Sequence, residues 1–143
     1  MNPLLVVTAA PVNPHFARLG GEPAVARLVD AFYRAMSSRA DARTIRAMHP
    51  ADLTATRQVL NDYLCEWLGG PRRYSARRGP PKLRRAHRAF AIDAAARDAW
   101  MACMRDALGE VCADAALRGE LEHAFARIAE HIVNQSANPS RPS

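Results

Sequence analysis

The sequence predicts a single all-α domain, and three observations support this fold class. Apolar residues recur at helical spacing along most of the chain, and no period-2 run of β-branched residues is bounded by turns. The length of 143 residues is that of one domain. A chain of this size buries roughly two-thirds of its surface on folding, so it needs no disulfide or metal for stability. We expect five or six helices and no internal repeat.

The first two long helices are predicted from their boundaries and their apolar faces. Proline is tolerated in a first turn, so Glu22-Pro23 begins the first helix. Its apolar face contains Val25, Leu28, Val29, Phe32 and Met36. The second follows His49-Pro50, with Asp52 or Thr54 as N-cap, and ends at Gly69-Gly70-Pro71, where glycine allows a left-handed cap. Its inner face contains Thr56, Val59, Leu60, Tyr63, Leu64 and Trp67.

The second half of the chain is predicted to hold a loop, a short helix and two long helices. Residues 71–81 are rich in Arg, Gly and Pro and are expected to form a loop, and a short helical segment at 82–88 carries His87. Asp93 is the expected N-cap of a helix with Trp100, Met101, Met104, Leu108 and Val111 on one face. The last helix covers roughly 118–133, with Leu121, Phe125, Ile128, Ala129, Ile132 and Val133 inward. We expect a flexible lead at 1–14, a folded domain at 15–133 and a flexible tail at 134–143.

Several classes of protein are excluded by composition. Three cysteines without a C-x-x-C pair argue against a disulfide framework and a zinc ribbon. No apolar run approaches the 18 residues that a membrane span requires. Leu4 to Val7 is too short and lacks the basic flank of a signal peptide, so we expect a cytoplasmic protein.

The positive charge of the chain is concentrated in one segment. The net charge is +6, and residues 72–88 carry eight basic side chains and no acidic one. The rest of the chain holds 12 basic and 14 acidic residues. The segment could be a solvated loop, a nucleic-acid patch or a clamp for an anionic cofactor. Only Tyr74 interleaves the arginines and no recognition motif is present, which argues against nucleic acid.

His87 and the aromatic residues each allow two interpretations. An imidazole next to cations and apolar residues suits the axial ligand of a haem, whose propionates need basic partners. A core histidine paired with a backbone carbonyl would have the same sequence pattern. Tyr33 and Trp100 lie on inward faces, either as core packing or as polar donors facing a cavity. His123 and His131 lack a third ligand for zinc.

In this order and spacing, the residues resemble the group II truncated haemoglobins over positions 15–133. The resemblance is carried by Leu19-Gly20-Gly21, Phe32-Tyr33, His49 to Leu53, Tyr63 to Pro71, Tyr74, Arg78-Gly79, Leu83 to His87, Phe90 to Ile92 and Arg97 to Met104. It implies a two-over-two α-helical sandwich around haem b (iron protoporphyrin IX), with His87 as the iron ligand. Two departures concern the propionate contacts, because Ala86 and Pro80 stand where many relatives have arginine and histidine.

The resemblance also assigns roles to other positions. Tyr33 and Trp100 match polar residues of the distal pocket, and His49 occupies a distal position that varies in the family. Tyr33, Trp100 and His49 are expected to offer up to three hydrogen-bond donors to a bound ligand. The full expected set of cofactor-binding residues adds Thr56 and Leu60 on the distal helix, Tyr74, Arg78 and Arg84 as propionate partners, and Tyr63 and Phe90.

The function implied by the resemblance is reversible binding or transport of dioxygen and other diatomic ligands, such as NO and CO. An alternative is a haem redox enzyme, a nitric-oxide dioxygenase or a peroxidase-like protein, using the same site. It would need a reductase partner, because the chain has no flavin or nicotinamide motif. A remote alternative is a haem-free basic helical protein that binds nucleic acid. We expect no nucleic-acid or membrane partner, and a monomer or homodimer.

Overall fold

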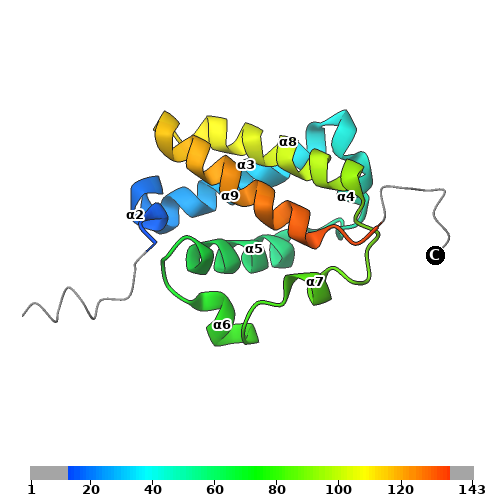
Figure 1. The fold of residues 1–143 in the computed structure, drawn as a ribbon, viewed down its shortest axis with the longest axis horizontal. Helices are drawn as coiled ribbons and strands as arrows, with labels where there is room; N and C mark the ends of the chain where they lie inside the picture. Colours follow the sequence, from blue (N-terminus) through cyan, green and yellow to red (C-terminus); the bar gives the residue numbers. More distant parts are fainter. Residues whose placement is uncertain (1–12, 136–143) are drawn as a thin grey trace, which may run out of the picture.

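Four long helices form two pairs that pack across each other. The computed structural model describes residues 13–135, and all regular secondary structure in this range is helical. The long helices are α3 (Gly21–Ser38), α5 (Thr54–Trp67), α8 (Ala94–Val111) and α9 (Ala115–Ile132). α3 packs on α5, α8 packs on α9, and α3 meets α8 at the centre (Figure 1). The predicted all-α, two-over-two arrangement is confirmed.

Short helices connect these pairs and raise the number of helices above the predicted five or six. They are α2 (His15–Leu19), the 3₁₀ turn η1 (Ala40–Ala42), α4 (Arg43–Ala47), α6 (Arg73–Arg78) and α7 (Leu83–Ala86). None exceeds six residues, so none is long enough to show a full apolar period.

The prediction of a continuous loop at 71–81 is wrong, because this segment contains α6. The carboxylate of Glu66 accepts hydrogen bonds from the Ser75 amide at 2.8 Å and from the Ser75 hydroxyl at 2.5 Å. One free N–H in the first turn of α6 therefore has a partner on α5. This partner lies nine residues away in the chain, which local composition could not indicate.

The helix boundaries confirm one predicted cap and correct another. Asp93 is the N-cap of α8 and accepts from the Ala96 amide at 2.8 Å, as predicted. For α5 the N-cap is Leu53, so the prediction of Asp52 or Thr54 is wrong. The Asp52 carboxylate accepts from the Thr54 amide at 3.0 Å and therefore stabilises the turn immediately before the helix.

The predicted apolar faces meet in one core. All five positions predicted for α3 are buried, together with Met101, Met104 and Leu108 of α8 and Leu121, Phe125 and Ala129 of α9. The three cysteines, Cys65, Cys103 and Cys112, are buried and unpaired. Val59 was predicted to face inward on α5 but is exposed, because the inner face of α5 borders a cavity rather than packed side chains.

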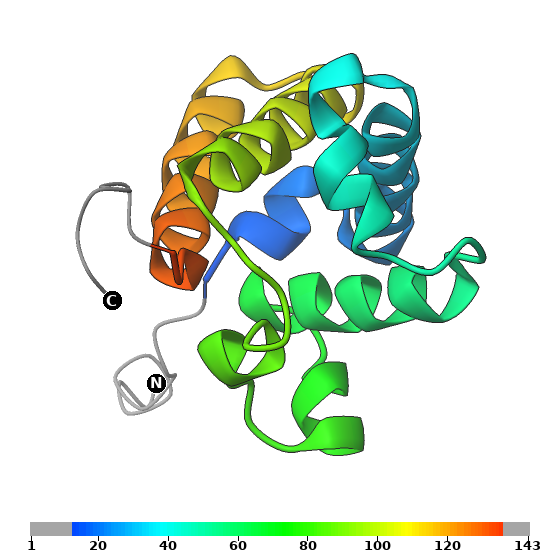
Figure 2. The same cartoon turned by 90° about the vertical axis from the view of Figure 1, so that its right-hand side faces the viewer.

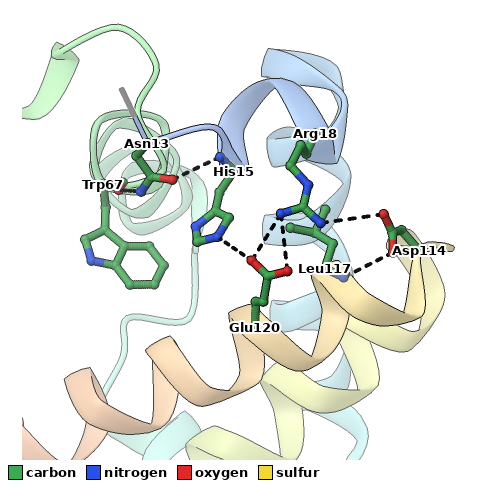
Figure 3. A network of polar contacts seen from close by, with 7 residues as sticks. All are labelled: Asn13, His15, Arg18, Trp67, Asp114, Leu117 and Glu120. Carbon is green, nitrogen blue, oxygen red and sulfur yellow. Dashed lines mark hydrogen bonds and ion pairs between the residues drawn. The ribbon is translucent and has the colours of Figure 1, made fainter. Parts of the chain in front are cut away.

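The segment from Asn13 to α2 is fixed to both helix pairs (Figure 3). The Asn13 amide donates to the Trp67 carbonyl at 3.0 Å, and the Phe16 N–H donates to the Leu68 carbonyl at 2.8 Å. On the other side, His15 and Arg18 contact the Glu120 carboxylate at 3.2 and 3.1 Å. Gly70 permits this approach, since a Cβ there would lie 2.6 Å from the Phe16 ring.

Residues 1–12 and 136–143, which make up most of the predicted flexible lead and tail, lie outside the described residues. In the part of the chain that the structure describes, no helix combines the length and apolar character needed to cross a membrane.

Candidate ligand-binding site

A cavity of about 430 Å³ lies between the helix pairs and is bordered by residues of all four long helices. Figure 2 shows how α5, α7, α8 and α9 are arranged around this region. Most of the lining side chains are apolar. Nine of the eleven residues predicted to bind a cofactor line it: Tyr33, His49, Thr56, Leu60, Tyr63, Tyr74, His87, Phe90 and Trp100.

His87 reaches the cavity from the C-terminal end of α7. Its Nδ1 lies 2.7 Å from the Leu83 carbonyl oxygen. A carbonyl only accepts hydrogen bonds, so Nδ1 carries a proton, and Nε2 is the nitrogen that has a lone pair in the neutral tautomer. The structure thus combines both interpretations of this residue: the imidazole is paired with a backbone carbonyl and also lines a cavity. A free Nε2 oriented by a bond at Nδ1 is the usual state of a metal-ligating histidine.

Tyr33 and Trp100 bring polar hydrogens to the cavity from α3 and α8. Tyr33 is 4% exposed, and burial raises the pKa of its hydroxyl to about 12. No hydrogen bond contributes to this shift, so the protonated hydroxyl is available as a donor at neutral pH. The Phe32 ring packs edge-on against both residues, at centroid distances of 5.0 and 5.3 Å. This buried ring holds the two donors in place.

His49, which follows α4, contributes an acceptor rather than a donor. Its Nδ1 lies 2.8 Å from the Ile45 carbonyl oxygen and must carry the proton. Burial lowers the pKa of His49, outweighing the hydrogen bond to Ile45, so the ring is neutral at pH 7. Nε2 therefore holds a lone pair. The expectation of three donors is corrected to two, since the geometry of His49 depends on a turn that the sequence does not reveal.

Arg78 and Arg84 do not line the cavity, unlike the other predicted residues. Arg78 and Arg77 contact one oxygen of the Asp62 carboxylate at 3.0 and 2.7 Å. Asp62 has no exposed surface. Burial alone would raise the pKa of Asp62, but hydrogen bonds from Arg78, Gln58 and Arg77 lower it overall. A carboxylate on the inward side of α5 thus holds two of the eight basic side chains.

A second hollow, of about 410 Å³, adjoins the cavity and is basic. Lys82, Arg84, Arg85 and His131 line it together with Pro81, and Tyr63 and Leu83 line both spaces. The Arg84 guanidinium donates to the His131 carbonyl at 3.0 Å, which ties α7 to the last turn of α9. We call this second hollow the basic groove. The sequence indicated an anion site in this segment but did not single out Lys82 and Arg85.

Several lining residues were not predicted as part of the site. Phe125, Ile128 and Ile132 of α9 had the expected apolar period but were assigned to core packing. Arg97 also lines the cavity, with its guanidinium bound to Glu130 at 2.5 Å and to Asp98 at 3.0 Å. Periodicity marks an inward face, but it does not distinguish a packed core from a cavity wall.

Comparisons with known proteins agree with this geometry. Residues 15–134 match the family model of the bacterial-like globins. The chain is 37% identical over 127 residues to the group 2 truncated hemoglobin YjbI of Bacillus subtilis, covering 86% of this chain and 91% of that protein.

Two solved structures are similar in fold as well as sequence. The group II 2-on-2 hemoglobin of Agrobacterium tumefaciens has a TM-score of 0.83 and 36% identity, covering 90% of this chain and 99% of that one. A truncated oxygen-avid haemoglobin of Bacillus subtilis has a TM-score of 0.77 and 33% identity, covering 84% and 98%.

Proposed function

This chain belongs to the bacterial-like globin family and is a group II truncated haemoglobin, and on this premise we propose that it binds haem b and reversibly binds dioxygen. One observation carries the proposal. The His87 ring lines an apolar cavity while its Nδ1 is held by the Leu83 carbonyl at 2.7 Å, which leaves Nε2 as the ring nitrogen available to a metal. An axial ligand of haem iron needs this tautomer and this orientation.

The walls of the cavity fit a large planar apolar group. Val59 and Phe90 line the cavity and are 37% and 39% exposed, the two large hydrophobic residues that stand out as exposed in the described chain. Exposed apolar side chains that share one concave surface are typical of a ligand site. A haem held in the cavity would reduce the exposure of both.

The polar residues supply different interactions around the bound ligand. When bound, ferrous haem supplies a metal centre that takes diatomic ligands. Tyr33 and Trp100 line the cavity, where the Tyr33 hydroxyl and the Trp100 indole N–H can donate to such a ligand. Nε2 of His49 can only accept, and a diatomic ligand has no hydrogen to donate to it. Donors stabilise a ligand that gains partial negative charge on binding. The truncated haemoglobin of Bacillus subtilis that shares 33% identity with this chain is oxygen-avid.

The basic groove is the proposed site of the haem carboxylates. It adjoins the cavity along Tyr63 and Leu83, so a substituent at the edge of the ring can reach it. Lys82, Arg84 and Arg85 offer the cations. They replace the arginine and histidine that many relatives have at the positions of Ala86 and Pro80. Arg78 is engaged by Asp62 and is a less suitable partner than the sequence suggested.

Haem titration of the apoprotein tests the proposal. Wild-type protein should bind one haem with a Soret band, and His87→Gly should lose the histidine-ligated spectrum and regain it on addition of free imidazole. His123→Gly, on the outer face of α9, is the matched control and should behave as wild type. Undiminished haem affinity and an unchanged spectrum in His87→Gly would reject His87 as the ligand.

Other expectations from the sequence stay predictions: nitric-oxide dioxygenation or peroxidase-like turnover, a reductase partner, a cytoplasmic location, and a monomer or homodimer.

A further inference from the structure

The chain that follows α7 forms a large part of the cavity wall without regular helix. His87, Phe90 and Ile92 all line the cavity, and all lie between the end of α7 at Ala86 and the start of α8 at Ala94. α7 is only four residues long. A single helical turn holds its C-terminal residue weakly, so the position of the His87 backbone depends on other contacts.

Besides the local backbone bonds of His87 to Leu83 and Phe90, this segment is held by one residue that follows α9. The Asn134 side-chain amide donates to the His87 carbonyl at 3.2 Å and to the Phe90 carbonyl at 2.9 Å. Its Oδ1 accepts from the Ile92 N–H at 2.8 Å. The backbone N–H groups of Asn134 and Gln135 both donate to the Ile92 carbonyl, at 2.9 and 3.1 Å. Asn134 thus binds the carbonyl or amide of each residue that this segment places on the cavity.

A second tie reinforces the first. Arg84 of α7 donates to the His131 carbonyl at 3.0 Å, so that α7 and the segment after it are both bound to the end of α9.

Only an amide side chain can bind the His87 carbonyl, the Phe90 carbonyl and the Ile92 N–H at once, since two N–H groups and one carbonyl are needed on the same side chain. The match between this side chain and the loop is therefore specific.

We infer that Asn134 is a positioning residue that fixes His87 at the proximal wall of the cavity. The inference rests on the proposed function, in which His87 ligates haem iron. A hydrogen bond to the His87 carbonyl and a bond from His87 Nδ1 to Leu83 restrain the same residue at its backbone and at its ring. Outer contacts of this kind determine how a ligand approaches its metal. The residue that follows α9 thereby restrains the backbone of the histidine that would hold the haem iron.

The test compares haem-loaded variants at Asn134. Asn134→Asp keeps the acceptor for Ile92 and removes both donors, to His87 and to Phe90, while Asn134→Ala removes all three side-chain bonds to the segment after α7. Haem dissociation should accelerate about five- to tenfold in Asn134→Asp, as expected for the loss of two solvent-accessible hydrogen bonds, and at least as much in Asn134→Ala. The iron–histidine stretching frequency of the unliganded ferrous protein, measured by resonance Raman spectroscopy, should shift or broaden.

Two controls separate positioning from general destabilisation. Gln135→Ala removes a neighbouring side chain that donates to Asn134 Oδ1 and to none of the cavity-lining residues, keeps the Gln135 backbone bond to Ile92, and should leave both readouts unchanged. Asp114→Ala removes the N-cap of α9 at its opposite end, and should lower stability without altering the stretching frequency. An unchanged frequency and haem dissociation rate in Asn134→Asp, or the same shift in Asp114→Ala, would overturn the inference. If wild-type protein binds no haem through His87, the proposed function itself fails and the inference with it. If wild-type protein binds haem through His87 but the Asn134 variants have the wild-type dissociation rate and stretching frequency, only the inference fails.

Discussion

Replacing Tyr33 by Phe should accelerate dioxygen release from the haem-loaded protein. The hydroxyl lies at the cavity, its pKa is raised to about 12 by burial, and no hydrogen bond contributes to that pKa. It is therefore protonated at neutral pH and free to donate to a bound ligand. Phenylalanine keeps the ring, and with it the edge-on contacts with Phe32 and His49 at 5.0 and 5.9 Å.

The size of the effect follows from the strength of the lost bond. A hydrogen bond to a charged acceptor is worth about 1.5–3 kcal/mol, and each 1.4 kcal/mol changes a rate about tenfold. The dissociation rate should therefore rise about 10- to 100-fold. Because the substitution leaves no protein group without a partner, the free energy of unfolding of the apoprotein should stay within about 0.5 kcal/mol of wild type or increase.

Stopped-flow mixing of the dioxygen complex with excess carbon monoxide measures the dissociation rate directly. Tyr63→Phe is the matched control, because Tyr63 also lines the cavity and burial also raises its pKa to about 12. It borders the basic groove, so its loss should change the rate less than about threefold. The reasoning is refuted if Tyr33→Phe releases dioxygen at the wild-type rate, or if Tyr63→Phe has an equal effect.

Two further predictions concern the scaffold around the site. Asp62→Asn should cost about 1–3 kcal/mol of unfolding free energy at pH 7, since a buried carboxylate bonded by two arginines is neutralised. Because folding lowers the pKa of Asp62, its contribution to stability is present above the unfolded pKa of about 3.9 and is lost at lower pH. In urea titrations, the difference in unfolding free energy between variant and wild type should therefore be smaller at pH 3 than at pH 7. A difference that does not depend on pH would contradict this. Gly70→Ala should lower the thermal unfolding midpoint measured by calorimetry, because the added Cβ would lie 2.6 Å from the Phe16 ring. Gly119→Ala in α9 is the control and should raise the midpoint slightly, since no atom lies within 4 Å of the added Cβ. Equal midpoints in the two variants would count against the close contact at Gly70.

Patterns in the sequence predicted the long helices, one helix cap and most of the residues of the candidate site. The helical period located the long helices, and the spacing around Asp93 identified a cap that the structure confirms. Nine of eleven predicted site residues line one cavity, six from helices and three (His49, His87 and Phe90) from the segments that follow α4 and α7. The short helices α2, α4 and α6 were missed, since a helix of five or six residues has no full period to detect.

The helical class of this protein, the inward face of each long helix and the histidine at the cavity could all be predicted from the amino-acid sequence. Which polar groups contact one another could not, because most of those contacts form between distant segments. Asp62 forms ion pairs with Arg77 and Arg78, so these arginines are engaged away from the basic groove. The Ile45 carbonyl binds Nδ1 of His49 and leaves its Nε2 as an acceptor. Asn134 binds residues that lie 42 to 47 positions before it in the chain. Periodicity reports burial along one helix, whereas each of these pairings depends on the directions of particular donors and acceptors, which are set when the chain packs.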